Sequence, residues 1–434
     1  MVRTSGFHPE NRGSIPLGPT SGTTFGRSGQ ISSNPNSKID SPSKATYHFG
    51  MKELKEIYLD HASTTPTDPR VLKEMLPYFS EKYGNPEVPH TKGKEALMAI
   101  DRARETIAKI LNCRDSEIIF TGSATEANNL VIFGLAGASK KGTHIITSTI
   151  EHSSVRHPCD KLEEEGWEIT RLKADKEGFV SPADLEKAIT PQTALVSIMH
   201  ANNEIGTIQP IEELGEICQK HNIPFHTDSC QTAGTHDLDV KKLKVDALTI
   251  NGGKIYGPKG VGALYIKRGT PIEPIIYGGN HERGLRAGTH NTPGIIGLAK
   301  ALELVQKEKD KENKRLSKLR DTMIEGILKN IPASILNGPK EKRLPGNINV
   351  TIPGIDAQEL LLHLDQKGIY ASSGAACTLG KNSPSNTLIA IGIPKKEVFS
   401  SIRISLGKQN TASDIEDAIK IMSDVCSKLR KRKP

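Results

Sequence analysis

The segment NGGKIYGPKG, residues 251–260, surrounds Lys254 and Lys259 with glycines. Glycine lets the backbone turn sharply or approach a ligand closely. The segment therefore fits three interpretations: a phosphate-binding loop, a plain turn before a strand, or the seat of a lysine that does covalent chemistry. The phosphate-loop pattern G-x-x-x-x-G-K-[ST] is not met, because Lys259 is followed by Gly260 and Val261.

Polar residues follow several apolar runs that have the composition of buried strands. Asp228 lies near the end of IPFHTDS, His152 follows HIITST, and Asn203 follows ALVSIMHAN. An acid at the end of a parallel strand suits a metal, a ribose or a protonated heterocycle, whereas a single histidine is often structural. The small residues of FTGSATEANN precede a helix, whose first N–H groups either bind a phosphate or are simply capped.

A lysine on a glycine-lined turn, near an acid and a phosphate-type turn, fits a Schiff-base lysine. In this interpretation Lys254 binds pyridoxal 5'-phosphate (PLP), and Asp228 pairs with the pyridinium nitrogen and keeps the ring an electron sink. A third group is the segment SSGAACTLGKNSPS, which places Cys377 among small residues. This cysteine is either a thiol on a moving loop or a buried structural residue.

Alternating strands and helices must position these residues. Between residues 115 and 266 the apolar pattern predicts strands at 117–121, 144–149, 167–173, 194–202, 223–229, 246–251 and 262–268. Helices are predicted at 124–138, 153–166, 182–189 and 211–222, the third with Ser181 as its N-cap. This alternation favours an α/β domain with a largely parallel sheet, whose ligands gather at the carboxyl ends of the strands.

The C-terminal part of the chain has a different pattern. A long helical stretch is predicted from 293 to about 331, with a charged middle. After it, strands at 347–352 and 400–406 and helices at 357–368 and 412–429 indicate a smaller α+β unit. No internal repeat is apparent.

Composition limits the class of protein. With 434 residues, the chain has room for two or three domains, and no run of about 18 apolar residues predicts a membrane span. The net charge is +8, and the basic end SKLRKRKP is either a solvated helix end or a contact for a partner. Aromatic residues make up only 4%, so direct nucleic-acid binding is not expected. The six cysteines form no C-x-x-C pair, which indicates a reducing compartment.

Residues 1–50 differ from the rest of the chain. They are rich in Ser, Gly and Pro, poor in acids, and without apolar periodicity. Such a segment cannot bury a core. Three interpretations stay open: a transit peptide, a disordered tail, or a non-native extension before a true start at Met51. We expect a cytoplasmic protein, or an organellar one if residues 1–50 are a transit peptide.

Together these residues resemble the cysteine desulfurases, PLP enzymes of the class V aminotransferase superfamily, in the branch that serves iron–sulfur cluster assembly and tRNA thiolation. The likeness runs from about Ile57 to about Leu406 through YLDHASTTP, ATEANN, EHSSV, HANNEIG, DSCQ, KIYGPKG, HERGLRAGT, SSGAAC and SSIRISLG. It implies an α/β protein of PLP-dependent transferase fold type I. We expect a large PLP-binding domain at 67–305 with a mostly parallel seven-stranded sheet, and a smaller α+β C-terminal domain built from 51–66 and 306–434.

The resemblance also implies catalytic roles. Lys254 would hold PLP covalently, and His152 would stack on its ring and help to move protons. Cys377 would take the sulfur of L-cysteine as a persulfide and leave L-alanine as the other product. No metal site is expected, although Cys377 is positioned to contact a cluster within a partner complex.

Further contacts follow from the same resemblance. The cofactor would touch Ala124 and Thr125 at its phosphate, Asn203 beside the ring, Asp228 at the ring nitrogen, Gln231 at the ring hydroxyl, and Asn251 and Gly253 next to the lysine. Thr289 would reach the phosphate of a second subunit, which implies a homodimer with shared sites. Arg403 would bind the substrate carboxylate, and Asn85 would lie near the substrate. The sulfur acceptor is expected to be a protein such as a cluster scaffold or a tRNA thiolation enzyme.

Two departures from the family pattern concern the phosphate. The usual Ser-Gly-His before the lysine is replaced by Asn251, Gly252 and Gly253, and the usual Ser-Gly is reversed to Gly122 and Ser123. We expect weaker or rearranged phosphate anchoring. The alternatives to a desulfurase are a selenocysteine lyase, another class V aminotransferase-type enzyme, or a catalytically weak scaffold paralogue.

Overall fold

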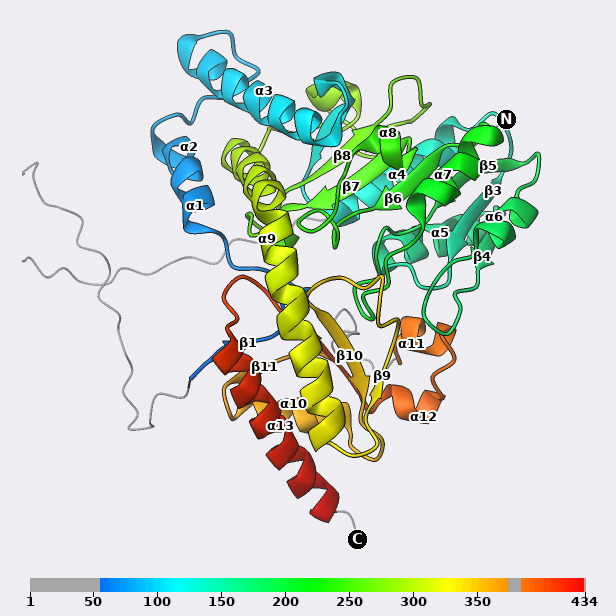
Figure 1. The fold of residues 1–434 in the computed structure, drawn as a ribbon. Coiled ribbons are helices and arrows are strands. Elements are labelled where there is room, and N and C mark those ends of the chain that lie inside the picture. The colour runs from blue at the N-terminus through cyan, green and yellow to red at the C-terminus, as the bar shows by residue number, and fades with distance from the viewer. Residues whose placement is uncertain (1–54, 374–383, 433–434) are drawn as a thin grey trace, which may run out of the picture. The chain divides into compact units, whose positions relative to one another are not determined.

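A seven-stranded sheet forms the centre of the fold (Figure 1). The computed structural model describes residues 55–373 and 384–432. In spatial order the sheet contains β2 (Ile118–Thr121), β8 (Gly262–Ile266), β7 (Ala247–Asn251), β6 (Phe225–Asp228), β5 (Thr193–Ser197), β3 (His144–Ser148) and β4 (Glu168–Leu172). Only β8 runs antiparallel to its neighbours β2 and β7. The predicted mostly parallel seven-stranded sheet is confirmed.

Helices cover both faces of this sheet, because alternate strand residues point to opposite sides. Ile119 and Ile145 pack in one apolar cluster with α4 (Ala124–Ala138) and α5 (Ser153–Glu164). Ile118 and Ile146 lie in the cluster on the other face. That cluster is built with α3 (Thr91–Leu111), α6 (Pro182–Ala188), α7 (Ile211–Lys220) and the first part of α9 (Thr292–Asn330).

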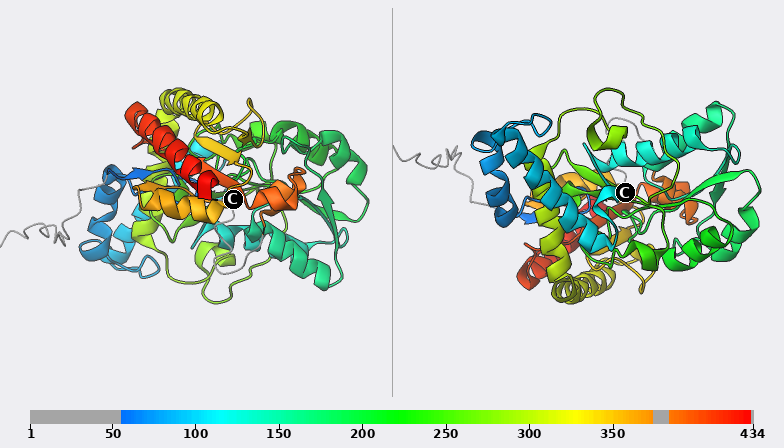
Figure 2. Two further views of the ribbon diagram at one scale, coloured as in Figure 1. Left: turned by 90° about the horizontal axis from the view of Figure 1, so that it is seen from below. Right: turned by 90° about the horizontal axis from the view of Figure 1, so that it is seen from above.

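A second, smaller core lies around the three-stranded antiparallel sheet of β9 (Ile335–Leu336), β10 (Asn347–Thr351) and β12 (Ser401–Ser405). Its helices are α10 (Ala357–Asp365), α13 (Ala412–Arg432) and the end of α9. Figure 2 (left) shows α10 and α13 side by side. The short strand β1 (Ile57–Tyr58) pairs with β11 (Ile369–Tyr370), so the start of the described chain lies with these C-terminal elements.

Helix α9 joins the two cores. Val305 packs in the cluster of the large sheet, whereas Leu316 packs in the cluster of the small sheet. Figure 1 shows α9 running from one region to the other without a break. The predicted domain boundary between residues 305 and 306 falls inside this helix, and the division into domains stays a prediction.

Most predicted elements agree with the structure to within a few residues, and Ser181 caps α6 as expected. The predicted strand at 194–202 is shorter, since β5 ends at Ser197 and the chain then turns towards Asn203. Helix α3 was not predicted. The remaining short elements are α1 (Pro69–Met75), α2 (Pro77–Ser80), α8 (Val240–Leu243), α11 (Asn386–Ala390), α12 (Lys395–Val398), and the 3-10 turns η1 (Asp115–Glu117), η2 (Gly252–Lys254) and η3 (His281–Gly284).

Two sequence expectations fall outside the described residues. The extension 1–50 and Cys377 lie outside them, so neither prediction is tested by the structure. Within residues 55–373 and 384–432, no helix has both the length and the apolar character needed to span a bilayer.

Candidate active site

A cavity of about 260 Å³ opens at the carboxyl ends of the parallel strands, where ligands of such sheets bind. Most of the predicted site residues line it: Ala124, Thr125, His152, Asn203, Asp228, Gln231, Asn251, Lys254 and Arg403. They come from the ends of β2, β3, β5, β6 and β7 and from the middle of β12. Segments far apart in the sequence therefore meet in one place.

Asp228 is buried at the end of β6 and is held at both carboxylate oxygens. Asn128 Nδ2 donates to Oδ2 at 2.7 Å, and the backbone N–H of Cys230 donates to Oδ1 at 3.0 Å. The same Asn128 Nδ2 donates to Ser154 Oγ at 2.8 Å. These bonds fix the direction in which the carboxylate faces the cavity, as is required of an acid that must meet one ring nitrogen.

His152 caps α5, and this role determines where its proton lies. Its Nδ1 accepts from the backbone N–H of Ser154 at 3.1 Å and lies 2.8 Å from Ser154 Oγ. A nitrogen that accepts an N–H carries no proton of its own, so the neutral ring carries its proton on Nε2. Burial lowers the pKa of His152, with Lys254 contributing in the same direction and Asp228 opposing. The imidazole is therefore neutral at pH 7.

Lys254 ends the turn η2 that follows β7 and points towards the N-terminal segment. Its Nζ donates to the carbonyl of Ala62 at 2.9 Å and to the carbonyl of Ser63. Gln231 Nε2 donates to the same Ala62 carbonyl at 3.1 Å. Residues 62–63 thus form a wall of the cavity, a role that sequence reasoning did not find.

The predicted phosphate region combines the start of α4 with the turn before Lys254. Ser123 caps α4 by accepting from Glu126 N at 3.2 Å, and the backbone at Ala124 and Thr125 lines the cavity. Asn251 Oδ1 accepts from Gly253 N at 3.0 Å. Ser123 is consequently occupied as a cap, and Asn251 is the polar side chain of the turn that faces the cavity.

Arg403 is buried in β12 and is held by an ion pair. Its Nη2 donates to Asp60 Oδ1 at 2.7 Å and to Ser63 Oγ, and its Nη1 donates to the carbonyl of Asn203 at 3.2 Å. Among the residues that the structure describes, none accepts a hydrogen bond from the buried Nε of Arg403. Backbone bonds join Arg403 to Ser372, which lies shortly before the segment that contains Cys377.

Three predicted contacts do not line this cavity. Gly253 donates its N–H to Asn251 Oδ1 in the same turn, and its carbonyl accepts from Thr65 N of the N-terminal segment at 2.9 Å. Thr289 is exposed in the loop before α9, and Asn85 is exposed before α3. Within one chain, Thr289 and Asn85 stand apart from the site, whereas Gly253 adjoins the cavity residues Asn251 and Lys254.

Sequence reasoning missed Asn128, Ser154 and Met199, which support or line the cavity. A signal existed for Asn128, since it lies one helical turn after Ala124 on an otherwise apolar face of α4. No such pattern marks Ser154 or Met199.

The residues present fit PLP. One cavity contains an amine, a buried carboxylate fixed by two donors, and the start of a 15-residue helix. These are the groups that a reactive aldehyde, a protonated ring nitrogen and a phosphate require.

Comparison with known proteins agrees with this geometry. Residues 57–417 match the family model described as aminotransferase class-V. A cysteine desulfurase IscS from Clostridium botulinum is 47% identical over 383 residues, which cover 88% of this chain and 96% of the relative.

Two solved structures are also similar. A structure titled NIFS-like protein has a TM-score of 0.81 and 38% identity, covering 86% of this chain and 100% of its own. A structure titled SspA in complex with cysteine has a TM-score of 0.72 and 39% identity, covering 81% and 99%. The chain belongs to the class V aminotransferase family, whose members are PLP-dependent enzymes.

Proposed function

We propose that this protein is a PLP-dependent cysteine desulfurase, which converts L-cysteine to L-alanine and an enzyme-bound persulfide. The single observation behind this proposal is that one cavity brings together Lys254, Asp228 and Arg403. The amine of Lys254 suits a cofactor aldehyde, and the carboxylate of Asp228 suits the cofactor's ring nitrogen. The guanidinium of Arg403 suits a substrate carboxylate. The relatives named cysteine desulfurase supply the choice of reaction within the family.

Each residue has a defined task in this proposal. The chemistry that PLP supplies when bound is withdrawal of electrons from the substrate's α-carbon. Lys254 is the point of covalent attachment, and Asp228 keeps a proton on the ring nitrogen. Neutral His152 presents its Nε2–H to the cavity side and takes part in proton transfer. Arg403 orients the substrate through its carboxylate.

The sulfur acceptor within the enzyme is proposed to be Cys377. Burial raises the thiol pKa of the five described cysteines: Cys113, Cys159, Cys218, Cys230 and Cys426. Cys230 lines the cavity, but its thiol is kept protonated by burial and by Asp228. A thiol of that kind is a poor nucleophile. Cys377, from the SSGAAC segment, is therefore the residue assigned to attack the substrate sulfur.

The proposal extends to the assembly and its partners. Thr289, which is exposed and stands apart from the cavity, would reach the phosphate of a second subunit in a homodimer. A sulfur acceptor protein, such as a cluster scaffold or a tRNA thiolation enzyme, would then receive the persulfide. A cytoplasmic location is part of this proposal.

An absorption spectrum with and without L-cysteine tests the function directly. The purified protein is expected to be yellow, to change its visible band on adding L-cysteine, and to release alanine. Lys254→Ala should abolish the lysine-bound band and the activity, and Cys377→Ala should abolish transfer to a protein acceptor. A protein that binds no PLP in a titration, or full activity of Cys377→Ala, would overturn the proposal. Parallel assays with selenocysteine separate a desulfurase from a selenocysteine lyase.

A further inference from the structure

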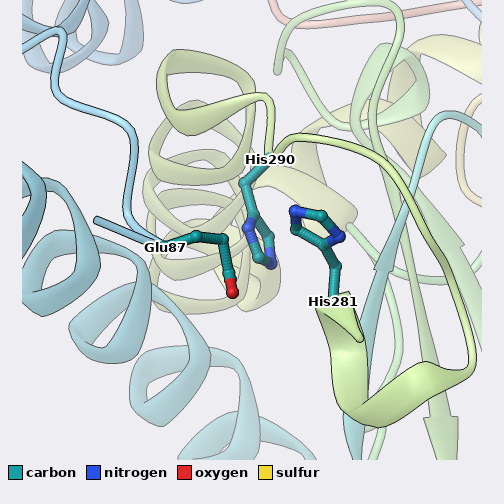
Figure 3. Close-up of side chains that lie close together, drawn as sticks. All are labelled: Glu87, His281 and His290. Atoms are coloured by element: carbon teal, nitrogen blue, oxygen red, sulfur yellow. The ribbon is translucent and has the colours of Figure 1, made fainter. Parts of the chain in front are cut away.

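Glu87, His281 and His290 gather outside the active-site cavity (Figure 3). Each offers one ligand atom, and these atoms lie within 4.8 Å of one another. Glu87 comes from the loop before α3, His281 begins η3, and His290 lies just before α9. Three separate segments thus direct metal-ligand side chains to one point.

His290 is prepared as a ligand by its second nitrogen. Its Nε2 lies 2.8 Å from Glu282 Oε1, and the side chain of His290 is only 8% exposed. Its Nδ1 is buried, and no described residue forms a hydrogen bond with it. A histidine that donates one N–H to a carboxylate while the other nitrogen keeps its lone pair is the arrangement found in metal-binding histidines.

Glu282 is held in place by N–H donors on both of its oxygens, so it faces His290 as a hydrogen-bond acceptor. Arg104 donates to both of its oxygens at 2.8 Å, and Phe120 N donates to Oε2 at 2.8 Å. His290 therefore donates to Glu282 through its Nε2–H, and Nδ1 is the nitrogen available to a metal ion.

The other two ligands are held by their loops. The ring of His281 lies with its centroid 5.4 Å from that of His290, and its Nδ1 accepts only a long bond, 3.3 Å, from Gly288 N. Glu87 is exposed, and its backbone N–H donates to Asn85 Oδ1 at 3.0 Å in a tight turn. Among the described residues, the only hydrogen bond to either ligand group is the long one at His281 Nδ1, so a cation would not have to break a strong bond.

The chain conformation at this cluster is unusual. Glu282 and Arg283 both have positive φ, 47° and 57°, which non-glycine residues rarely adopt. The ion pair with Arg104 and a bond from Arg283 Nη2 to Ile118 O at 2.8 Å hold this conformation. Residues kept in such conformations often serve a functional site.

We propose that Glu87, His281 and His290 bind a divalent transition-metal ion, with zinc as the representative ion. Two imidazoles and one carboxylate form a ligand set that zinc accepts in tetrahedral geometry, with water in the fourth position. Calcium and magnesium prefer oxygen ligands and do not suit it. The ion would fasten the loop that contains Thr289 to the start of α3.

Zinc titration of the PLP-loaded protein against a chromophoric chelator tests this site. All variants are made in one starting protein, the parent, which carries Cys377→Ser because the Cys377 thiolate would also bind zinc. The parent should bind about one zinc ion per chain at this site, and Glu87→Ala, His281→Ala and His290→Ala should each lose it. Glu81→Ala, an exposed acid nearby, and His363→Ala on α10 are matched controls that should retain it.

The melting temperature is a second measurement, and it distinguishes loss of the zinc site from misfolding of a variant. Zinc should raise the melting temperature of the parent and of both controls, but not that of Glu87→Ala, whose exposed side chain is not needed for folding. Zinc binding that persists in any one of the three ligand variants, or a parent that binds no zinc, would overturn the site. Both measurements detect bound zinc and not catalysis, so their result does not depend on whether the protein is a cysteine desulfurase.

Discussion

At the residue scale, the orientation of Asp228 is the main determinant of the proposed chemistry. Asn128 and the backbone of Cys230 occupy one lone pair on each oxygen and leave the rest for a ligand. An ionised acid is needed there because only a negative charge favours a protonated ring nitrogen.

Asp228→Asn is expected to lower kcat roughly 10²- to 10⁴-fold, the range of a lost proton-transfer or charge-stabilising group. The amide keeps the shape of the side chain and removes its charge. Steady-state kinetics with L-cysteine measure the effect. Asp237→Asn, an exposed acid that pairs with Lys242, is the control and should keep wild-type rates. Equal rates in both variants would contradict the role of Asp228.

Arg403→Lys should raise the KM for L-cysteine about tenfold or more, since a charge-assisted hydrogen bond contributes about 1.5–3 kcal/mol. Lysine keeps the charge but loses the planar fork that matches a carboxylate. The measurement is the separation of KM from kcat, with Arg70→Lys at an exposed ion pair as control. An unchanged KM would assign Arg403 to structure alone, through its bond to Asp60.

At the scale of elements, the turn η2 shows how two adjacent glycines differ. A Cβ at Gly252 would lie 2.6 Å from the carbonyl of Pro258, so this position must remain glycine. A Cβ at Gly253 would meet nothing closer than Asn251 Oδ1 at 3.5 Å. The position where the family pattern has histidine therefore has room for a side chain.

Gly253→His is expected to bind PLP roughly tenfold to a hundredfold more tightly, because it restores one charge-assisted bond of about 1.5–3 kcal/mol. Titration of the apoprotein with PLP, followed by absorbance, gives the affinity. Gly252→Ala is the control and should instead destabilise the turn. If Gly253→His bound PLP no better than the wild type, Asn251 and the start of α4 would already provide full anchoring.

At the scale of the whole molecule, three buried histidines and the partly buried His236 make stability depend on pH. Burial lowers the pKa of His61, His226 and His236 to about 4 and that of His200 to about 3. In the unfolded chain they titrate near 6.5, so between pH 6.5 and 4 the unfolded state binds more protons. Their contribution is complete above pH 6.5 and is lost as the pH falls.

The free energy of unfolding should therefore fall as the pH drops below 6.5, with a limiting slope of about 1.4 kcal/mol per pH unit for each histidine that stays neutral in the folded state. Burial raises the pKa of Glu151 to about 8 and also raises that of Glu204, so these two carboxyl groups oppose the trend. Urea denaturation at a series of pH values measures the slope. His226→Gln should make the slope shallower, and a constant stability over this range would contradict the explanation.

The sequence by itself determined the strands of the large sheet, most of the long helices other than α3, and the chemical groups at the strand ends. Apolar periodicity is local, so strands, helices and the polar residues that follow β3, β5, β6 and β7 could be predicted without knowing how the chain folds. The motifs also indicated the family. The boundaries were less accurate where tertiary contacts end an element early, as at Ser197 in β5.

Only the tertiary structure decided which distant groups meet. Asn128 and Asp228 are 100 residues apart, Asp60 and Arg403 are 343 apart, and Glu87 lies far from His281 in the sequence. No local pattern encodes these pairings, because they depend on the order of strands in the sheet and on how α9 joins the two cores. The physical reason is that side-chain spacing within one segment is set by backbone geometry, whereas contacts between segments are set by packing of the whole chain.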